Sequence, residues 1–220
     1  MKIKDILLFE NQLSKEELAV MNSSRDYCQK ELLPRIIDAN RKEIFDKGIY
    51  KEMGEMGFLG APIDGYGCAG TNYVSYGLIA REIERVDSSY RSAYSVQTSL
   101  AMHAIYKFGS DKQKDFYLPQ MAKGELIGCF GLTEPDAGSD PSSMKTCSIE
   151  KDGGYVINGS KTWITNAPIA DVLIVWAKDE QGVLRGFIVD RDAKGLSTPI
   201  IEGKFSLRAS ITGQIFLEDV

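Results

Sequence analysis

The sequence has 220 residues, of which 43% are hydrophobic and 26% are charged, proportions typical of a soluble globular protein with an ample core. Its 31 acidic and 26 basic side chains give a net charge of −5, which excludes an electrostatic footprint for nucleic acid or for an anionic membrane surface. No apolar run is long enough for an integral membrane segment and residues 1–10 lack the order of a targeting peptide, so we expect a cytoplasmic protein, or a mitochondrial matrix protein if the source is eukaryotic.

The first part of the chain shows the spacing of helices. Ser14 and Glu17 form a capping box, and apolar residues at helical spacing follow as far as Pro34, which we expect to bend or end this helix. A second helix is predicted from Arg41 to Met56, with Gly57 placed to end it.

A glycine-rich loop, Phe58–Gly70, precedes the remaining helices. Thr71 is expected to cap a third helix that runs through Val86, and a fourth, apolar helix is predicted over Ser92–Phe108. Ser110 starts a short polar helix that should stop near Pro119. Five helices with modest connectors predict an all-α N-terminal domain, and the absence of a G-x-G-x-x-G motif argues against a Rossmann domain.

From about residue 128 the hydrophobic period changes to two, which predicts strands. An Asn158-Gly159 pair suggests the turn of a hairpin between the first two of them. The strands are expected, in order, at Tyr155–Ile157, Ser160–Thr165, Asp171–Lys178, Val183–Asp190, Leu196–Ile201 and Gln214–Leu217. Strands at this spacing with no helices between them predict an antiparallel β-barrel or sandwich, so the fold class is α+β, with a helical domain over 1–127 and a β domain over 128–220.

The stretch that joins the two parts, Phe130–Ser143, is rich in glycine, proline and hydroxyl side chains. Backbone N–H groups in such an irregular loop are free to face a phosphate or a flat heteroatom-rich ring. Glu134, Asp136 and Asp140 would repel a phosphate unless they face away. The alternative is a Pro/Gly connector between two structural layers.

The four cysteines are widely spaced and form no C-x-x-C pair, and the lone His103 cannot complete a zinc set. We therefore expect no metal site. His103 lies in an apolar helical stretch and should pack there, and no G-x-S-x-G elbow supports a Ser-His-Asp mechanism. The thiols, which we expect to be structural, are Cys28, Cys68, Cys129 and Cys147.

Two long motifs carry a resemblance that covers the whole chain. Thr133–Asp140 matches T-E-P-x-x-G-S-D, and Asn158–Asn166 matches N-G-x-K-x-W-I-T-N. Helices followed by these motifs and a compact β domain resemble the acyl-CoA dehydrogenase family. Within it, the chain is most similar to glutaryl-CoA dehydrogenases, on the stretches Glu84–Ser88, Tyr90–Ser92, Gly128–Leu132 and Gly203–Ser210, the last with Ser206 where the wider family has glycine.

The resemblance implies FAD bound between the helical and β layers. Thr165 would hydrogen-bond near the flavin atom that accepts hydride, where donors stabilise the developing negative charge. For Trp163, the alternative is a residue that mainly packs in the core of an alternating strand. The implied cofactor-binding residues are Phe130, Gly131, Leu132, Thr133, Gly138, Ser139, Trp163, Ile164 and Thr165.

The resemblance also implies an acyl-CoA substrate, with Ser139 in contact with it. Arg91 and Ser92, with Glu84 beside them, resemble the grip of the glutaryl enzymes on the distal carboxylate, which a guanidinium binds through two parallel hydrogen bonds. The alternative is that Arg91 pairs with Asp87 or Glu84 on an exposed helix end, which contributes little to stability.

The implied activity is α,β-dehydrogenation of glutaryl-CoA, with decarboxylation to crotonyl-CoA left open. The family's carboxylate base belongs to a later helical domain that this sequence does not contain, so no catalytic residue is assigned and this chain alone is expected to be inactive. Glu134 is not expected to be the base. Implied partners are an electron-transfer flavoprotein and further copies of the subunit in a tetramer. The alternative is a non-catalytic flavin- or acyl-CoA-binding or assembly protein.

Overall fold

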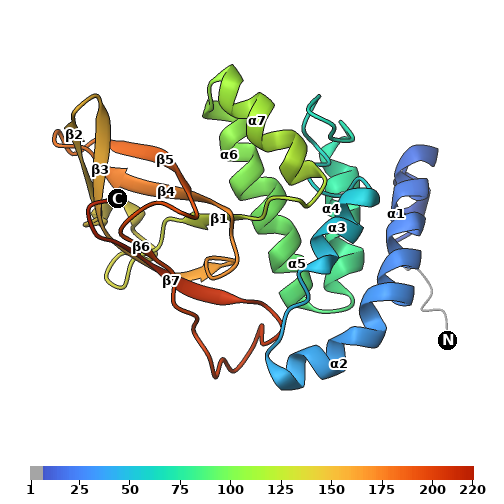
Figure 1. Cartoon of the computed structure of the whole chain (residues 1–220). Helices are drawn as coiled ribbons and strands as arrows, with labels where there is room; N and C mark the ends of the chain where they lie inside the picture. The colour runs from blue at the N-terminus through green and yellow to red at the C-terminus, as the bar shows by residue number, and fades with distance from the viewer. Residues whose placement is uncertain (1–6) are drawn as a thin grey trace.

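The structure, a computed structural model, describes residues 7–220 and divides into a helical half and a sheet half that lie side by side (Figure 1). The chain builds the helical half first and enters the sheet half at β1 (Gly128–Gly131), so the predicted α+β order is confirmed. No helix within residues 7–220 is long and apolar enough to cross a membrane. The expectation about a targeting peptide rests partly on residues 1–6, which lie outside the described residues.

Five continuous helical segments form the helical half of the described chain, after a short 3-10 turn η1 (Phe9–Gln12). Two of these segments contain a π-helical stretch in their middle. The segments are α1 (Lys15–Tyr27), η2 (Cys28–Leu32) and α2 (Leu33–Lys42) as one run; α3 (Gly48–Glu55); α4 (Tyr73–Glu84); α5 (Ser88–Ser95), η3 (Val96–Met102) and α6 (His103–Phe108) as one run; and α7 (Asp111–Ala122).

Two of the five predicted helix starts, at Ser14 and Ser110, are where the sequence places them. The capping box at Ser14 is formed, with the Glu17 N–H donating to Ser14 Oγ and the Ser14 N–H donating to Glu17 Oε2. The prediction that Thr71 caps the third helix is wrong, because Asn72 Oδ1 accepts the Ser75 N–H at 2.8 Å instead. The Thr71 hydroxyl donates to the Ala61 carbonyl and serves the preceding loop.

Three predicted helix boundaries, at Pro34, Arg41 and Pro119, differ from the structure. Pro34 does not end the helix: the helical run continues through it, and the π-helical η2 lies just before it, where the backbone hydrogen-bond pattern is already altered. The second predicted helix exists as α3, but its predicted start at Arg41 is wrong, because α2 includes Arg41 and ends at Glu43, which has a left-handed φ of 55°. Pro119 lies inside α7, which continues three residues past it.

The fourth helix begins earlier than predicted, and this affects the candidate site. Asp87 caps α5 by accepting the Ser89 N–H at 2.7 Å, so the helix starts at Ser88. Arg91 and Ser92, which the sequence placed at the helix start, therefore lie in its second turn.

The sheet half contains seven strands in the order β1-β4-β2-β3-β7-β6, with β5 paired to β4. Four of the pairings are antiparallel as predicted, but β1 and β2 each pair with β4 in parallel. Besides β1, the strands are β2 (Cys147–Lys151), β3 (Gly154–Thr165), β4 (Val172–Lys178), β5 (Leu184–Asp190), β6 (Leu196–Ser197) and β7 (Thr212–Leu217). The sixth is shorter than the predicted Leu196–Ile201.

The predicted hairpin turn at Asn158-Gly159 is wrong. Those two residues lie inside β3, which pairs with β2 before them and with β7 after them. The hairpin turn is at Asp152 and Gly153, both with positive φ. Gly159 is required for another reason: it has a φ of 148°, and a Cβ there would lie 2.5 Å from Thr146 Oγ1.

The two faces of β4 belong to two different cores. Val172 and Ile174 pack in the cluster that the helices form, whereas Leu173 and Val175 pack in a second cluster inside the sheet half. Strand β4 therefore separates the two halves. The neighbouring strand β1 is bonded to the helical half at its first residue, where the Gly128 N–H donates to Oε1 of the buried Gln97 in η3 at 2.7 Å.

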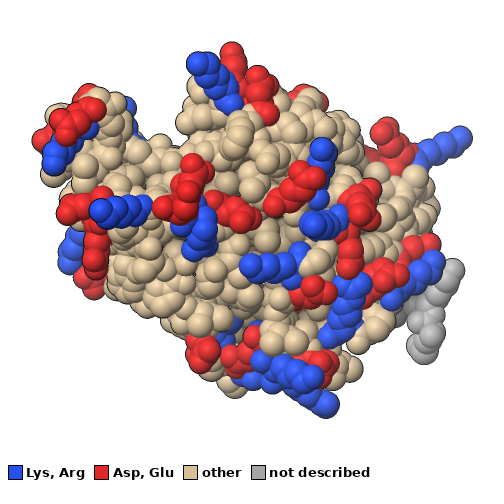
Figure 2. Space-filling view, in the orientation of Figure 1, with Lys and Arg blue, Asp and Glu red and all other residues tan. Residues whose placement is uncertain are grey.

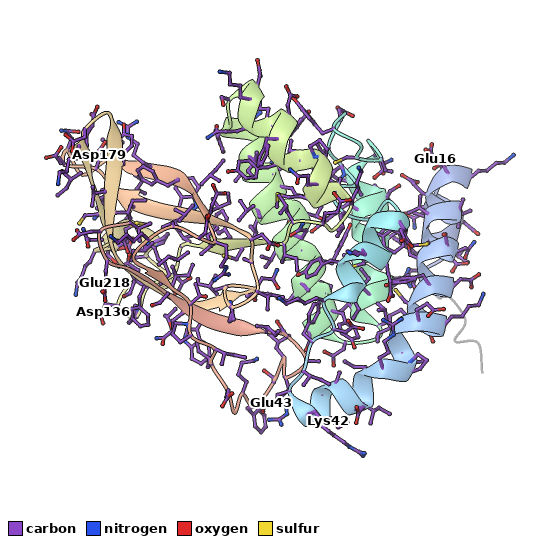
Figure 3. All side chains as sticks on the ribbon, viewed as in Figure 1. Glu16, Lys42, Glu43, Asp136, Asp179 and Glu218 are labelled. Atoms are coloured by element: carbon purple, nitrogen blue, oxygen red, sulfur yellow. The ribbon has the colours of Figure 1, made fainter. Side chains whose placement is uncertain are left out.

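A second junction lies at the end of α2, where the loop before β7 meets the helices. Glu43, near the lower edge of Figure 3, pairs with the Arg208 guanidinium and accepts the Gly203 N–H at 2.9 Å. Arg208 also donates to the Asn40 carbonyl at 3.1 Å. On the face seen in Figure 2, acidic and basic side chains are interspersed, in agreement with the modest net charge.

Candidate functional site

The two sequence motifs lie next to each other. The segment from Gly128 to Thr133 runs alongside residues 162–166 in the opposite direction and is joined to it near both ends. The Thr162 N–H donates to the Thr133 carbonyl at 2.9 Å, and Asn166 Nδ2 donates to the Gly128 carbonyl at 3.0 Å. Thr133 and Thr165, predicted to act on one ring, therefore belong to neighbouring segments on one surface.

The helical half reaches this surface through Ser92. Its Oγ lies 3.3 Å from Thr165 Oγ1, so a hydrogen bond joins α5 to the end of β3. Both residues are half-buried. The structure thus brings together a residue predicted to bind substrate and a residue predicted to bind the cofactor.

Trp163 is not a core residue, which removes the alternative of simple packing. Thr162 and Trp163 oppose the single residue Gln214 of β7, so β3 is bulged at this point. Trp163 adopts a φ of 59° and its side chain is 62% exposed. A left-handed backbone is unfavourable for a bulky residue and, next to a candidate site, indicates a functional constraint. The side chain of Ile164 is buried in the sheet core, so only its backbone is available to a ligand.

The glycines and the aromatic residue of the first motif have different surroundings. A Cβ on Gly131 would lie 3.0 Å from Ile215 Cδ1 and 3.3 Å from Lys161 Cγ, so this glycine makes room for packed neighbours. Gly138 is exposed with nothing within 4 Å of such a Cβ, and Ser139 beside it is exposed. The ring of Phe130 lies 5.9 Å from that of Trp176 on β4.

Glu134 is fully engaged within its own loop. Its carboxylate accepts the N–H groups of Lys145 at 2.6 Å and Thr146 at 3.0 Å, and Lys161 Nζ at 2.8 Å. Burial by itself would raise the pKa of Glu134, but these donors outweigh it and lower the pKa to about 2. An ionised, bonded carboxylate of this kind is not a proton acceptor at neutral pH, which agrees with the expectation that Glu134 is not the base.

Arg91 pairs with Glu84, as the alternative interpretation held. Its Nε donates to Glu84 Oε2 at 2.8 Å and its NH1 donates to Ser95 Oγ at 3.2 Å. Glu84 also accepts the Ser88 hydroxyl, and these hydrogen bonds, with Ser88 as the main donor, lower the pKa of Glu84. Arg91 is only half-buried, and its guanidinium faces Glu84 and Ser95 at the edge of an open depression between α4 and α5.

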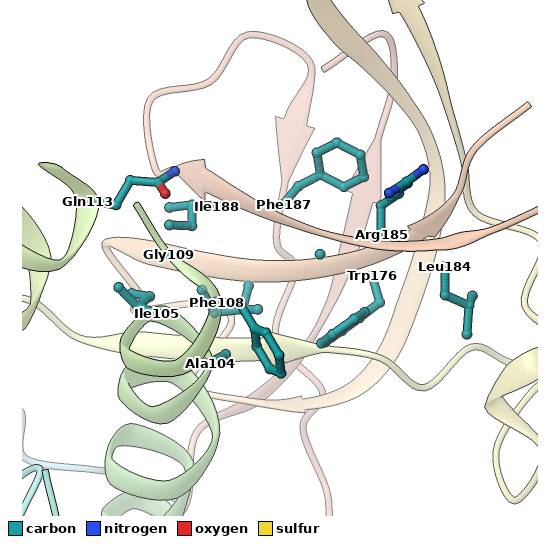
Figure 4. A pocket seen from close by; sticks show the side chains of 12 residues that line it. Ala104, Ile105, Phe108, Gly109, Gln113, Trp176, Leu184, Arg185, Phe187 and Ile188 are labelled. Atoms are coloured by element: carbon teal, nitrogen blue, oxygen red, sulfur yellow. The ribbon is translucent and has the colours of Figure 1, made fainter. Parts of the chain in front are cut away.

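One cavity lies away from the two motifs. It has a volume of about 440 Å³ and is lined from α6, β4 and β5, with Phe108 and Trp176 among its lining residues (Figure 4). None of the residues predicted to bind substrate or cofactor lines it. Arg91 and Glu84 instead line a more open depression of about 580 Å³ beside α4.

Sequence reasoning missed three buried polar residues that hold this surface in place. Lys161 is fully buried and donates to the Leu132 carbonyl. Asn166 donates to the Gly128 carbonyl, and Gln97 accepts the Gly128 N–H. The signal for Lys161 was present, because a lysine in the middle of a strand that is otherwise apolar on that face requires a buried partner.

Two of the four thiols fit the structural role expected of them, whereas Cys147 is exposed and Cys68 is half-buried. Cys28 and Cys129 are buried, and burial raises the pKa of each to about 12, so both are protonated and unreactive at neutral pH. No group of His, Cys, Asp and Glu within residues 7–220 is arranged to hold a metal ion. His103 is half-buried beside Tyr106, as a packing role requires.

Comparison with known protein families covers almost the whole chain. Residues 14–125 match the acyl-CoA dehydrogenase N-terminal domain, and residues 129–220 match the acyl-CoA dehydrogenase middle domain. A probable acyl-CoA dehydrogenase of Bacillus subtilis, YngJ, is 37% identical over 215 residues, which is 95% of this chain and 57% of the relative.

Solved structures agree with these matches. A glutaryl-CoA dehydrogenase from Mycobacterium smegmatis has a TM-score of 0.96 and 44% identity, over 98% of this chain and 56% of the other. The structure of a glutaryl-CoA dehydrogenase from the same organism in complex with FADH2 has a TM-score of 0.94 and 43% identity, over 96% and 54% of the two chains. The chain thus spans about half the length of the proteins it matches.

Proposed function

The chain belongs to the acyl-CoA dehydrogenase family, and from this premise we propose that it forms the FAD-facing part of an enzyme that oxidises glutaryl-CoA. The observation that carries the proposal is the pairing of the two motif segments, with Ser92 of the helical half in contact with Thr165 at their end. That arrangement collects hydrogen-bond donors from both halves on one surface.

The donors around Thr133 fit a flat heteroatom-rich ring. Leu132 and Thr133 are half-buried, and within residues 7–220 their N–H groups have no acceptor. Half-buried donors of this kind require water or a ligand. FAD, when bound, supplies the acceptor for the substrate's β-hydride. Thr133 and Thr165 would hold the ring and stabilise charge on it, Trp163 would cover it, and Gly138 and Ser139 would lie along its outer part.

The proposed substrate follows from the Arg91 cluster. An acyl-CoA that ends in a carboxylate offers Arg91 a charged partner that can form two parallel hydrogen bonds. In this structure the Arg91 guanidinium is paired with the Glu84 carboxylate at 2.8 Å, and both side chains are partly exposed. The terminal carboxylate of the acyl group would compete with Glu84 for this guanidinium. The similarity to glutaryl-CoA dehydrogenases of known structure supports this choice over an unbranched monocarboxylic acyl-CoA.

The carboxylate base of the reaction is assigned to no described residue. Glu134 is excluded because its carboxylate is hydrogen-bonded to Lys145, Thr146 and Lys161. The same observation favours a second candidate: a chain that binds flavin or acyl-CoA without performing the oxidation. An electron-transfer flavoprotein is the proposed acceptor of electrons, and the exposed Trp163 is a surface through which such a partner could approach the ring.

An anaerobic absorbance titration distinguishes the two candidates. The protein is loaded with FAD and then mixed with glutaryl-CoA or with butyryl-CoA. Loss of the oxidised flavin band with glutaryl-CoA, in a protein extended to the full length of its relatives, supports the dehydrogenase. Retention of that band with every acyl-CoA, despite bound FAD, supports the binding protein. Failure to bind FAD rejects the dehydrogenase and leaves only a protein that binds acyl-CoA.

A further inference from the structure

The buried amine of Lys161 has a role that the reaction does not explain. Lys161 lies in β3, its side chain is fully buried, and its Nζ donates to two oxygens of the loop that follows β1. These are the Leu132 carbonyl at 3.2 Å and Glu134 Oε1 at 2.8 Å, with Met144 Sδ at 3.7 Å completing the surroundings. Gly131 leaves the space through which the stem of Lys161 passes.

Glu134 extends the connection to the far end of the same loop. Its carboxylate accepts the N–H groups of Lys145 and Thr146 as well as the Lys161 amine. One ion pair therefore fixes the two ends of the loop, residues 132–134 and 144–146, to the middle of β3.

Stability is a poor explanation for this pair. Removing two charges from water costs as much as their attraction returns, and buried ion pairs can often be replaced by neutral residues of similar size without loss of stability. Lys161 and Glu134 are 0% and 6% exposed, which places them in this class. A pair of neutral residues would lack the hydrogen bond by which the Lys161 amine orients the Leu132 carbonyl.

That direction determines where the next N–H points. The peptide bond between Leu132 and Thr133 is planar and trans, so its C=O and N–H point to opposite sides. Since the carbonyl points at the Lys161 amine, the Thr133 N–H points away from that amine, and it has no acceptor within residues 7–220. The next carbonyl, of Thr133, is fixed by the Thr162 N–H, so the peptide cannot rotate.

We propose that Lys161 and Glu134 are positioning residues, which orient the Leu132–Thr133 peptide so that the Thr133 N–H faces the flavin. The ammonium polarises the carbonyl it holds and makes the N–H on the other side a stronger donor. Glu134 neutralises the ammonium, so the ring meets an oriented dipole and no net charge. The inference rests on the proposed flavin site and adds to it residues that do not touch the ring.

The test is a double substitution with a matched control. Glu134→Gln combined with Lys161→Met removes both charges together and leaves no unpaired ion in the core. We expect FAD to bind about tenfold more weakly, because an oriented donor is lost, and the flavin reduction potential to become more negative. The control is Asp136→Asn with Lys145→Met, which removes a largely exposed ion pair of 2.9 Å from the same loop and should change neither quantity.

A purely structural role gives a different result. If the double variant melts at a lower temperature but binds FAD with the wild-type dissociation constant and potential, the positioning role is rejected. If the double variant does not fold, Glu134→Gln alone leaves the ammonium uncompensated, and a potential equal to that of the wild type again rejects it. Wild-type protein that takes up no FAD rejects the proposed function, which is a separate outcome.

Discussion

The hydroxyl oxygens of Ser92 and Thr165 lie 3.3 Å apart across the boundary between α5 and β3. Ser92 belongs to the stretch that resembles glutaryl-CoA dehydrogenases, and Thr165 belongs to the second family motif. They are separated by more than seventy residues in the sequence. Two predictions made from different motifs, one about substrate and one about cofactor, therefore meet at a single hydrogen bond.

Ser92→Ala should weaken FAD binding without unfolding the protein. The substitution removes the partner of the Thr165 hydroxyl, and the loss of one part-buried hydrogen bond corresponds to about a fivefold rise in the dissociation constant. Flavin fluorescence quenching measures that constant. Ser99→Ala is the control, because Ser99 is exposed on the same helical segment and its hydroxyl donates only to the Ser95 carbonyl. Equal constants for the two variants would contradict the prediction.

Arg91→Ala should lower the activity on glutaryl-CoA much more than the activity on butyryl-CoA. Loss of a charged, bidentate hydrogen bond is expected to lower kcat/KM for glutaryl-CoA by about tenfold to a hundredfold while leaving butyryl-CoA nearly unaffected. Steady-state kinetics of the holoenzyme on both thioesters provide the comparison. Arg85→Ala, on the neighbouring exposed helix end, is the control. Equal losses on both thioesters would remove Arg91 from the carboxylate role and leave it as the partner of Glu84.

Glu134 should contribute stability that disappears in acid. Its folded pKa of about 2 lies below the ordinary value of 4.5, so the unfolded chain binds more protons between these pH values. The contribution, on the order of 3 kcal/mol for the ionised carboxylate relative to its protonated form, is therefore complete above about pH 4.5 and is lost as the pH falls toward 2. Urea unfolding at pH 5.5 and pH 3 measures it. Glu134→Gln should flatten this part of the pH profile, and an unchanged slope would contradict the assignment.

Trp163→Gly should make the protein more stable and less able to bind FAD. Glycine adopts the observed φ of 59° without strain, which is worth about 1 kcal/mol, and the exposed ring loses little burial. Thermal unfolding and FAD titration give the two quantities. Trp163→Ala removes the same ring but keeps a Cβ, so it should lose FAD affinity without the gain in stability. A lower melting temperature for the glycine variant would show that the ring packs more than its exposure indicates.

Two glycines of the first motif should respond differently to alanine. Gly131→Ala brings a methyl group within 3.3 Å of Lys161 and 3.0 Å of Ile215, and crowding of this kind costs about 1–2 kcal/mol. Gly138→Ala meets nothing within 4 Å and should change the free energy of unfolding by less than about 0.5 kcal/mol. Chemical denaturation of both variants tests the contrast, which fails if the two free energies fall together.

Much of the architecture could be predicted from local patterns. The capping box at Ser14, the buried strand that became β4 and the change from helices to strands near residue 128 all follow from spacing and turn chemistry. The errors arose where tertiary contacts override those patterns. Asn158-Gly159 is a strong turn signal, but the close approach of Thr146 uses the glycine to bend a continuous strand.

The site shows the same division. The motifs located Thr133, Thr165 and Ser92, and the structure brings their segments together. The sequence could not reveal that Trp163 lies on a bulge, because an alternating apolar pattern does not record an inserted residue. Nor could it assign Lys161 a partner, since the carbonyl and the carboxylate that hold it come from a loop whose path depends on the folded sheet.

Strand β3 belongs to two ladders: residues 154–158 pair with β2, and residues 159–165 pair with β7. We therefore expect the part of β3 that carries Trp163 and Thr165 to open separately from the β2–β3 hairpin. Amide protons on either side of Asn158-Gly159 should accordingly exchange with solvent at distinct rates. A ligand bound at residues 159–165 would slow exchange only of the amide protons after Asn158, so deuterium uptake at individual residues would show whether the site is occupied.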